Sequence, residues 1–316
     1  MSAAPLVTVV ICTYNRADLL RRCLEALDRQ DVSPETFSVV VVDNRSTDDT
    51  GETVARHAQT APYALRRVVE ENQGTSHARN RGAKESVTPW LAFLDDDVRP
   101  HGDWMRRVLD FITAHPDAAM FGGPYLPDYL DPPPAWLPAE VGRFWHGEAE
   151  VRLPYRKHFL AGGNFMARRD AFEALGGFDP ALGPRGDDFH YGEDTAFYRR
   201  ALTLGQAVYY APRVVVDHLV RPEKYRLAWH AASLRELGRN LFRRLGPAVG
   251  IPAALCLAVA APVLAACNFC VFMDMPLKRR AYLALHPLGY AWGMLLGAES
   301  WLGRLGGRGR RRGTAS

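Results

Sequence analysis

The sequence predicts an α/β fold: a Rossmann-like, mostly parallel sheet flanked by helices, followed by a C-terminal apolar helical extension. Runs rich in Val, Ile and Leu alternate with stretches of helical periodicity, and polar residues follow each run directly. Residues 246–273 then contain no charged side chain. With 316 residues, 47% of them hydrophobic and 23% charged, the chain can bury one large core or two modest ones. This composition excludes a disordered chain and a small disulfide-stapled domain.

The first predicted strand is the apolar run Leu6–Cys12. We expect a helix within residues 15–30, because five apolar side chains recur there at the spacing of one helical face. They are Leu19, Leu20, Cys23, Leu24 and Leu27. Together the two segments form one strand–helix unit.

Three further strand–helix units follow. The second pairs strand Phe37–Asp43 with a helix inside residues 44–58, which Ser46 or Thr47 can cap. Strands that read as continuous Val, Ile and Leu runs must be buried on both faces, because a half-exposed strand would alternate polar and apolar residues. The pattern therefore predicts parallel strands with helices on both sides. The third and fourth units cover residues 65–86 and 90–115.

Polar side chains gather directly after the four predicted strands. In open parallel sheets, ligands bind at the carboxyl ends of the strands, where loops and helix N-termini converge. The sequence therefore places a ligand site at this edge of the sheet. The polar groups, strand by strand, are residues 13–16, 43–44, 71–74 and 95–97.

The fourth strand, "WLAFL", runs into three consecutive carboxylates, Asp95, Asp96 and Asp97. Three such groups at one strand end repel each other and are costly to bury unless a cation or a basic side chain neutralises them. A hard divalent cation suits oxygen ligands of this kind, typically one or two carboxylates together with substrate phosphates. The triplet predicts a metal site, although acidic residues on a solvated loop can also cap a helix.

Six segments in a fixed order resemble the inverting family 2 glycosyltransferases of the GT-A fold. An Asp-x-Asp motif alone would be weak support, but six ordered segments, over roughly residues 6–220, are specific. The resemblance implies an enzyme that moves a sugar from a nucleotide-diphosphate donor to an acceptor hydroxyl. The segments are "VVICTYNR", "VVVVDNRSTDDT", "NQGTSHARNRGAKES", "FLDDDV", "LAGGNFMARRDAFEALGGFDP" and "GEDTAFYRRALTLG".

The resemblance implies a nucleotide site on the first three strands. Asp43 would accept a hydrogen bond from the base, and Thr13, Tyr14 and Arg16 would line the nucleoside. Arg79 would lie near the base or the diphosphate. A UDP-sugar is the favoured donor, because UDP is the commonest nucleotide among such enzymes.

The resemblance also implies a divalent metal, Mn²⁺ or Mg²⁺. Asp95 and Asp97 match the Asp-x-Asp motif, and Asp96 could reach the ribose. His218, in "VVVDHLV", matches a position that supplies a further metal ligand or a diphosphate contact. A metal there would stabilise the charge that builds on the leaving diphosphate. A histidine after a strand is also often a purely structural residue.

The catalytic base implied by the resemblance is Asp194 in the "GED" motif. An alcohol needs such a base, since it is a poor nucleophile until its proton is being removed. Glu193 would orient the acceptor or support Asp194. Both residues stand at the predicted start of a helix, where the helix dipole favours ionised acids even without catalysis.

The acceptor side is less well defined by the sequence. Gly163 and Asn164 would contact the donor sugar or the acceptor, although Gly162 and Gly163 could simply permit a tight turn. Asp43 could likewise only cap the next helix. Residues 122–159 are rich in proline and aromatic side chains, which predicts irregular structure with faces for a sugar or lipid, or else a structural lid.

Other function classes fit the residues less well. A haloacid-type phosphatase would need Thr or Val where Arg99 stands, and a metal-dependent nucleotidyltransferase would need a glycine-rich loop after the first strand. A degenerate sugar-binding or nucleotide-binding protein without turnover would be expected to lose the carboxylates of one motif. We keep the last two as alternatives. The net charge of +4, with its excess in clusters after residue 235, does not indicate a nucleic-acid-binding protein.

The predicted organisation has three parts. Residues 1–225 form a GT-A catalytic domain, with a nucleotide-binding half in residues 1–100 and an acceptor-binding half in residues 101–225. Residues 226–303 form a helical, membrane-associated region, and residues 304–316 form an arginine-rich tail.

The C-terminal region predicts contact with a membrane. Residues 246–273 and 281–298 are apolar stretches with basic residues on either side, which fits a hairpin of two membrane segments or a re-entrant or interfacial pair. The enzyme would then sit on the cytoplasmic side of the cell membrane and act on a cell-envelope or lipid-linked glycan. If these helices pack on the domain instead, the protein would be cytoplasmic. The five cysteines lack metal-ligand or disulfide-framework spacing, which agrees with a reducing compartment.

Overall fold

The computed structural model describes residues 4–153, 160–185, 192–271 and 275–310, without the side chains of Arg244 and residues 303–310. It divides into two compact units. One comprises residues 1–130 and 139–220, and the other comprises residues 131–138 and 221–316. Parts of four predicted segments lie outside the described residues: the ends of the proline-rich and first apolar stretches, the residues before the "GED" motif, and the end of the tail.

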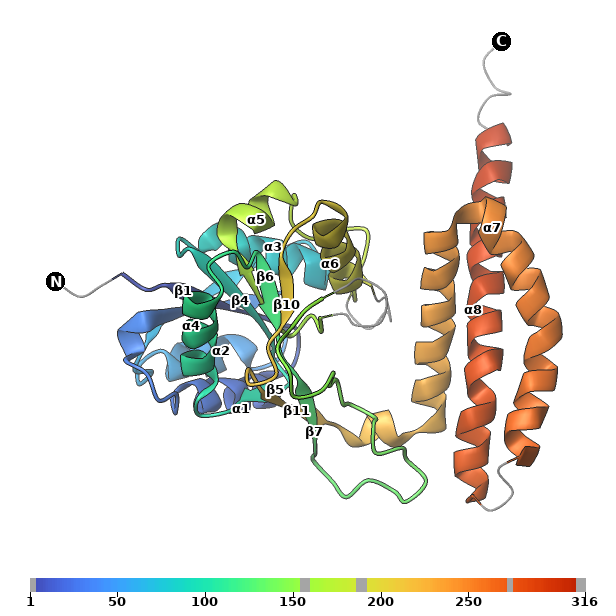
Figure 1. The fold of residues 1–316 in the computed structure, drawn as a ribbon, viewed down its shortest axis with the longest axis horizontal. Helices are drawn as coiled ribbons and strands as arrows, with labels where there is room; N and C mark the ends of the chain where they lie inside the picture. Colours follow the sequence, from blue (N-terminus) through green and yellow to red (C-terminus); the bar gives the residue numbers. More distant parts are fainter. Residues whose placement is uncertain (1–3, 154–159, 186–191, 272–274, 311–316) are drawn as a thin grey trace, which may run out of the picture. The chain divides into compact units, whose positions relative to one another are not determined.

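The first unit is built on an eight-stranded sheet with the order β3-β2-β1-β4-β9-β6-β10-β8 (Figure 1). Strands β3, β2, β1 and β4 are parallel, as predicted, whereas β9 is antiparallel to β4 and β6. The strands are β1 (Val7–Thr13), β2 (Phe37–Asp43), β3 (Ala64–Val69), β4 (Trp90–Asp95), β6 (Met120–Gly122), β8 (Val151–Arg152), β9 (Asn164–Arg168) and β10 (Val208–Tyr210).

Helices cover both faces of this sheet and divide its core in two. Consecutive residues of a strand point to opposite faces, so Val9 packs into one core while Val10 packs into the other. This explains why β1, β2 and β4 read as uninterrupted apolar runs. The helices are α1 (Ala17–Leu27), α2 (Thr50–His57), α3 (Thr75–Glu85), α4 (Trp104–Ala114), α5 (Arg169–Ala174) and α6 (Glu193–Thr203).

Helix α2 starts later than the sequence indicates. Its N-cap is Asp49, so the prediction that Ser46 or Thr47 caps it is wrong. Ser46 instead accepts a hydrogen bond, 3.0 Å, from the backbone N–H of Asn15 in the loop after β1. The hydroxyl that could cap a helix is used to join two loops.

A second, three-stranded sheet has the order β5-β11-β7. It consists of β5 (Val98–Pro100), β11 (Val216–Val220) and β7 (Tyr125–Tyr129). Strand β11 runs antiparallel to β5, with His218 opposite Val98. This pairing brings a histidine more than a hundred residues away in the chain next to the acidic triplet. Short 3-10 helices cover Pro34–Thr36 and Pro222–Tyr225.

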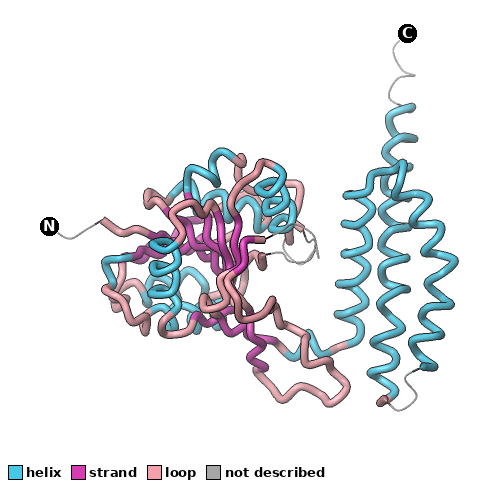
Figure 2. The backbone as a smooth tube through the Cα atoms, in the orientation of Figure 1, coloured by secondary structure: helices cyan, strands magenta, loops and turns pink. Residues whose placement is uncertain are grey.

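The second unit consists mainly of two long helices, α7 (Leu227–Val271) and α8 (Leu277–Arg310). Helix α7 is broken at Gly246, whose φ of 67° is not helical and which Pro247 follows. Figures 1 and 2 show α8 lying between the two halves of α7. Helix α8 also contacts both halves directly, through residues such as Gly293 and Met294.

Three glycines at a four-residue spacing bring α8 close to the first half of α7. A Cβ atom on Gly293 would lie 1.8 Å from the backbone oxygen of Arg235, and one on Gly289 would lie 2.6 Å from Cβ of Leu234. A Cβ on Gly297 would lie 2.8 Å from Phe242. Only glycine allows this approach of the two helices.

Within the described residues, one helical segment is long and apolar enough to cross a bilayer. It is Leu245–Val271, the second half of α7, and 22% of its most apolar 18-residue stretch is buried. Helix α8, which contains the second predicted apolar stretch, does not meet the same criterion.

Candidate active site

The carboxyl ends of β1, β2 and β4 meet at one edge of the large sheet. Thr13 lies opposite Asp43 in the β1–β2 pair, and Cys12 lies opposite Asp95 in the β1–β4 pair. The predicted nucleotide-side and metal-side residues are therefore neighbours across adjacent strands. The Thr13 side chain is buried at this edge and lies beside Asp96.

The loops after β1 and β2 are tied together by side chains. The Asn15 side-chain oxygen accepts a hydrogen bond of 2.7 Å from the Thr47 backbone, and Asp48 accepts one of 3.1 Å from the Ala17 backbone. Asn15 has a φ of 52°, a left-handed conformation that asparagine tolerates better than most residues. Tyr14 is half-buried in the same loop.

Asp43 is enclosed by its own neighbours. One carboxylate oxygen accepts a hydrogen bond of 2.8 Å from the Ser46 backbone, and the other accepts bonds from Nε and Nη2 of Arg67, the Nε bond being 3.0 Å. The Asp43 side chain is 1% exposed, whereas that of Arg67 is 38% exposed. Arg67 therefore covers the Asp43 carboxylate.

Basic side chains neutralise part of the acidic triplet. Arg16 donates a hydrogen bond of 3.0 Å to Asp96 and lies 3.6 Å from an oxygen of Asp97. Asp96 is almost fully buried, and burial raises its pKa to about 6. The nearby charge of Arg16 opposes this rise, and that of Asp97 adds to it. Asp96 is therefore held as the partner of an arginine from the β1 loop.

Asp97 lies beside His218. The Nε2 atom of His218 is 3.6 Å from an oxygen of Asp97, while Nδ1 is 3.1 Å from the backbone oxygen of Gly142. A neutral ring that donates from Nδ1 turns an acceptor nitrogen toward an acceptor oxygen, and a cation between the two atoms would stabilise both.

These residues fit part of a metal shell. No group of three or more His, Cys, Asp or Glu side chains in the described part of the chain is arranged as a complete metal site. Magnesium-type cations often take only one or two protein carboxylates, because substrate phosphates and water complete the shell. Asp97 and His218 would suffice for a cation that arrives with a diphosphate.

Arg79, on α3, joins the metal side to the predicted base. Its side chain is 5% exposed, and it donates hydrogen bonds of 3.0 Å to Asp95 and 2.8 Å to Glu193. The ring of Phe178 lies 5.3 Å from its guanidinium carbon. Arg79 therefore bridges two carboxylates 98 residues apart in the chain, rather than pointing into open space.

Glu193 and Asp194 open helix α6. Burial raises the pKa of Glu193 to about 7, Asp194 adds to the rise, and Arg79 opposes it. One oxygen of Asp194 accepts a hydrogen bond of 3.1 Å from the Gly162 backbone, and the other accepts one of 2.6 Å from Thr195. Asp194 is half-buried, so it is more accessible than Glu193.

Helix α3 also holds the chain that leads to α6. The Asn80 side chain donates to the Phe178 backbone oxygen and accepts from the Phe178 backbone N–H, both at 2.8 Å. Ser76 donates a hydrogen bond of 2.7 Å to the Leu182 carbonyl. Two side chains of α3 thus hold the chain between α5 and α6.

Gly163 sits where no side chain fits. A Cβ atom there would lie 2.0 Å from the Tyr125 hydroxyl and 2.1 Å from the Asp95 carboxyl group. Tyr125 itself donates a hydrogen bond of 3.3 Å to Asp95. Gly163 is therefore in contact with Asp95, and its absent side chain leaves room for the Tyr125 hydroxyl to reach that carboxylate.

Asn164 is placed in the scaffold. It is fully buried, donates to the Val214 and Pro124 carbonyls, and accepts a hydrogen bond of 3.0 Å from Trp104. These bonds occupy its amide group, which differs from the predicted contact with a sugar. Its role is to fix the turn that carries Gly163.

Two side chains gain a role that the sequence did not indicate. Arg67 lies in the edge strand β3 and covers Asp43, and nothing in the sequence distinguishes it from its neighbour Arg66. Tyr125, expected only as an aromatic face, holds Asp95 through its hydroxyl.

Comparison with known proteins now adds to this geometry. Residues 8–176 match the sequence profile described as "Glycosyl transferase family 2". Glycosyltransferase AglE of Haloferax volcanii is 31% identical over 222 residues, which are 70% of this chain and 69% of that protein. A glucosyl-dolichyl phosphate glucuronosyltransferase of the same organism is 28% identical over 71% of this chain and 72% of its own length. The succinoglycan biosynthesis protein ExoM of Rhizobium meliloti is 29% identical over 90% of each chain.

A solved structure shares the fold of this chain. The mannosyltransferase PcManGT from Pyrobaculum calidifontis, solved in complex with GDP-Man and Mn²⁺, superposes with a TM-score of 0.61 at 22% identity. The match covers 92% of this chain and 88% of that one. The predicted GT-A fold is confirmed.

We predict that Gly163→Ala damages the site, because the added methyl group would overlap Tyr125 and Asp95. Overpacking of this kind costs about 1–3 kcal/mol of unfolding free energy, measurable by urea denaturation. Gly102→Ala is the matched control, since a Cβ there would meet only the Arg29 carbonyl at 3.6 Å. Equal stability of the two variants would contradict the close contact of Gly163 with Tyr125 and Asp95.

Proposed function

The chain belongs to glycosyl transferase family 2, and from this membership we propose that it is an inverting glycosyltransferase with Asp194 as its base. The observation that carries the proposal is the Arg79 bridge, which ties the metal-side carboxylate Asp95 to Glu193, the neighbour of Asp194. Donor-side and acceptor-side groups thus belong to one site of the first unit. The chain is an enzyme of the glycosyltransferase class that uses nucleotide-sugar donors.

The proposed reaction is a single displacement at the anomeric carbon. The acceptor oxygen forms a bond to this carbon while the bond from the carbon to the diphosphate oxygen breaks. Asp194 takes the acceptor proton, and the nucleoside diphosphate leaves with the electron pair of the broken bond. The Gly162 and Thr195 backbone N–H groups fix the Asp194 carboxylate, so its orientation does not depend on the acceptor.

Asp95, Asp97 and His218 are the residues that would hold a divalent cation, Mn²⁺ or Mg²⁺. When bound, it would neutralise the charge that develops on the leaving diphosphate. The chain's own residues prepare its place: Gly142 orients the His218 ring, and Arg79 and Tyr125 fix Asp95.

The nucleoside is proposed to lie over the ends of β1 and β2. Thr13 and Tyr14 would line it, Arg16 would turn from Asp96 toward it, and Asp96 would then be able to accept a ribose hydroxyl. Asp43, with Arg67 in front of it, would read the base. A UDP-sugar remains the first donor to test, and the solved relative with GDP-Man makes a GDP-sugar the second.

The acceptor is proposed to be a lipid-linked or cell-envelope glycan. The names of two relatives, a glucosyl-dolichyl phosphate glucuronosyltransferase and a succinoglycan biosynthesis protein, support this class. Attachment of the second unit to the cytoplasmic side of the cell membrane would place the site near such an acceptor, and the apolar segment Leu245–Val271 supports that attachment.

The deciding experiment is donor turnover by the purified protein with Asp194→Asn as the test variant. We expect at least about a hundredfold loss in kcat, because the acceptor proton loses its base. Binding of the nucleoside diphosphate with Mn²⁺, measured by calorimetry, should stay within a few fold. Asp110→Asn, on the exposed face of α4, is the matched control. Binding without turnover in the unaltered chain would instead support a degenerate binding protein.

Metal dependence should follow His218. A chelator should abolish donor turnover, and added Mn²⁺ or Mg²⁺ should restore it. His218→Ala should lower the apparent affinity for the activating metal by at least about 10- to 100-fold, the range seen even for loss of an outer-shell partner of a metal ligand. His115→Ala, which removes a histidine paired with Glu150, serves as control. An unchanged metal titration in His218→Ala would contradict the proposed ligand.

Activity should rise with pH as Glu193 ionises. Burial raises the pKa of this carboxyl to about 7, so its charged pairing with Arg79 is complete only above that value and is lost as the pH falls. We expect kcat/KM to increase between about pH 6 and 8. In Glu193→Gln this limb should disappear, because the carboxyl group whose ionisation produces it is no longer present. A pH profile that does not move would exclude Glu193 as its origin.

A further inference from the structure

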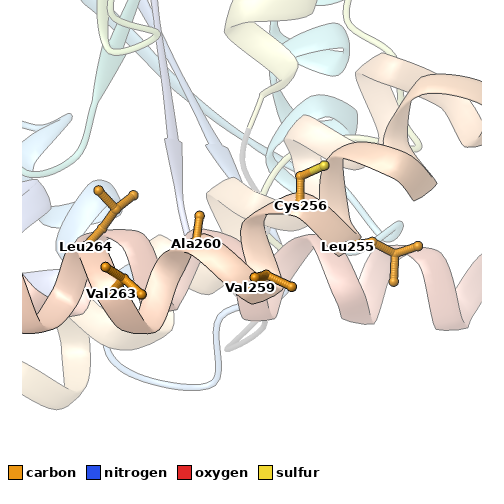
Figure 3. Close-up of a pocket in the computed structure, with 6 residues that line it drawn as sticks. All are labelled: Leu255, Cys256, Val259, Ala260, Val263 and Leu264. Atoms are coloured by element: carbon orange, nitrogen blue, oxygen red, sulfur yellow. The ribbon is translucent and has the colours of Figure 1, made fainter.

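The second half of α7 carries a continuous apolar face on its outer side. Val249, Val259 and Val263 are between 55% and 78% exposed. Figure 3 shows the side chains that line a shallow hollow on this face; they are Leu255, Cys256, Val259, Ala260, Val263 and Leu264. A contiguous exposed apolar surface marks a place of contact with a partner or a membrane.

The side-chain sizes on this helix are reversed relative to a soluble protein. The buried side consists of alanines, Ala254, Ala261 and Ala265, while larger Leu and Val side chains point outward. Small residues at helix–helix contacts and large aliphatic residues outside are typical of helices that face lipid. No charged residue interrupts residues 246–271, and basic residues flank the segment, with Arg243 before it and Lys278 after it. Acyl chains with anionic headgroups nearby fit this surface.

The contact between α8 and the first half of α7 limits how deep the unit can insert. Gly289, Gly293 and Gly297 lie inside the apolar stretch 281–298 and touch the backbone or side chains of residues 234–242. That part of α7 carries charged side chains, and Arg235 also stacks over Trp292 of α8. If α8 crossed a bilayer, these charges would be drawn to the depth of its core, where each is costly. The charges are on Arg235, Glu236, Arg239 and Arg243.

We propose that the second half of α7 lies in the plane of the membrane interface, with its apolar face among the acyl chains, and that neither α7 nor α8 spans the bilayer. The proposal rests on the proposed membrane attachment and specifies its geometry. The large apolar face then meets lipid, while the charged first half of α7 stays in the headgroup layer. The segment Leu245–Val271 is long enough to cross a bilayer. The helices packed on it, α8 and the first half of α7, are not apolar enough to enter the bilayer core with it.

The chain's cysteines supply a direct test. Cys256, Cys267 and Cys270 are exposed on α7, whereas Cys23 is buried and Cys12 is partly buried. Two full-length variants would keep one exposed cysteine each: one retains Cys270, and the other carries Val249→Cys at the opposite end of the segment. Each is labelled with a nitrobenzoxadiazole maleimide and bound to vesicles of phosphatidylcholine and phosphatidylglycerol. External dithionite, which does not cross the bilayer, then reduces every label on the outer side.

We expect both labels to be reduced at comparable rates, because both ends lie at the same interface. Protection of one label would mean that the helix spans, and would overturn the proposal. Vesicle flotation tests the membrane contact itself. The double variant Val259→Asp, Val263→Asp should lower the amount of vesicle-bound protein at least tenfold. Val87→Asp, at a 91% exposed site of the first unit, should not lower it. Equal flotation of both variants, or none by the unaltered chain, would also overturn it.

Donor turnover in detergent keeps this test separate from the proposed function. The two aspartate substitutions on α7 lie in the second unit, so they should leave turnover unchanged. Loss of flotation with full turnover would concern only the membrane contact. Absence of turnover with intact flotation would concern only the proposed catalytic function.

Discussion

The candidate active site depends on the neutralisation of clustered carboxylates, three of them buried, by two arginines. Asp95, Asp96, Asp97, Glu193 and Asp194 gather at the end of the sheet and the start of α6, and Arg16 and Arg79 bind four of them. Buried acids cannot stay ionised without such partners. Five carboxylates facing two guanidinium groups still leave an excess of negative charge, which a divalent cation would balance. The acidic triplet after β4 is therefore partly neutralised by arginines of the chain itself.

The same arginines determine how the parts of the site are connected. Arg79 touches Asp95 on one side and Glu193 on the other, so a change at the metal side alters the electrostatic environment of the proposed base. Arg79 and Asn80 both belong to α3, and Asn80 holds the segment that leads to α6. The resemblance suggested Arg79 as a nucleotide contact. In the structure Arg79 also links Asp95 to Glu193 through two hydrogen bonds.

The sequence predicted the fold well because burial leaves a local mark. Strands buried on both faces, such as β1 and β2, read as continuous apolar runs, and their ends were marked by Thr13 and Asp43. It failed where the partner is distant in the chain. Nothing local shows that Ser46 bonds the Asn15 backbone instead of capping a helix, that Arg67 covers Asp43, or that Asn164 spends its amide on backbone carbonyls. Such pairings depend on which strands lie side by side.

The packing of the C-terminal unit adds a constraint that the length of an apolar stretch does not show. Residues 281–298 looked like a second membrane segment because charges are absent within the stretch itself. The glycines that interrupt it bring in the backbone of Arg235, and with it a helix that carries charges. The depth of a helix is limited by the most polar element that packs firmly against it, since both must share one environment. The proposed orientation, with the second half of α7 in the plane of the membrane interface, satisfies this limit. One surface of the unit enters the lipid while the opposite surface stays hydrated.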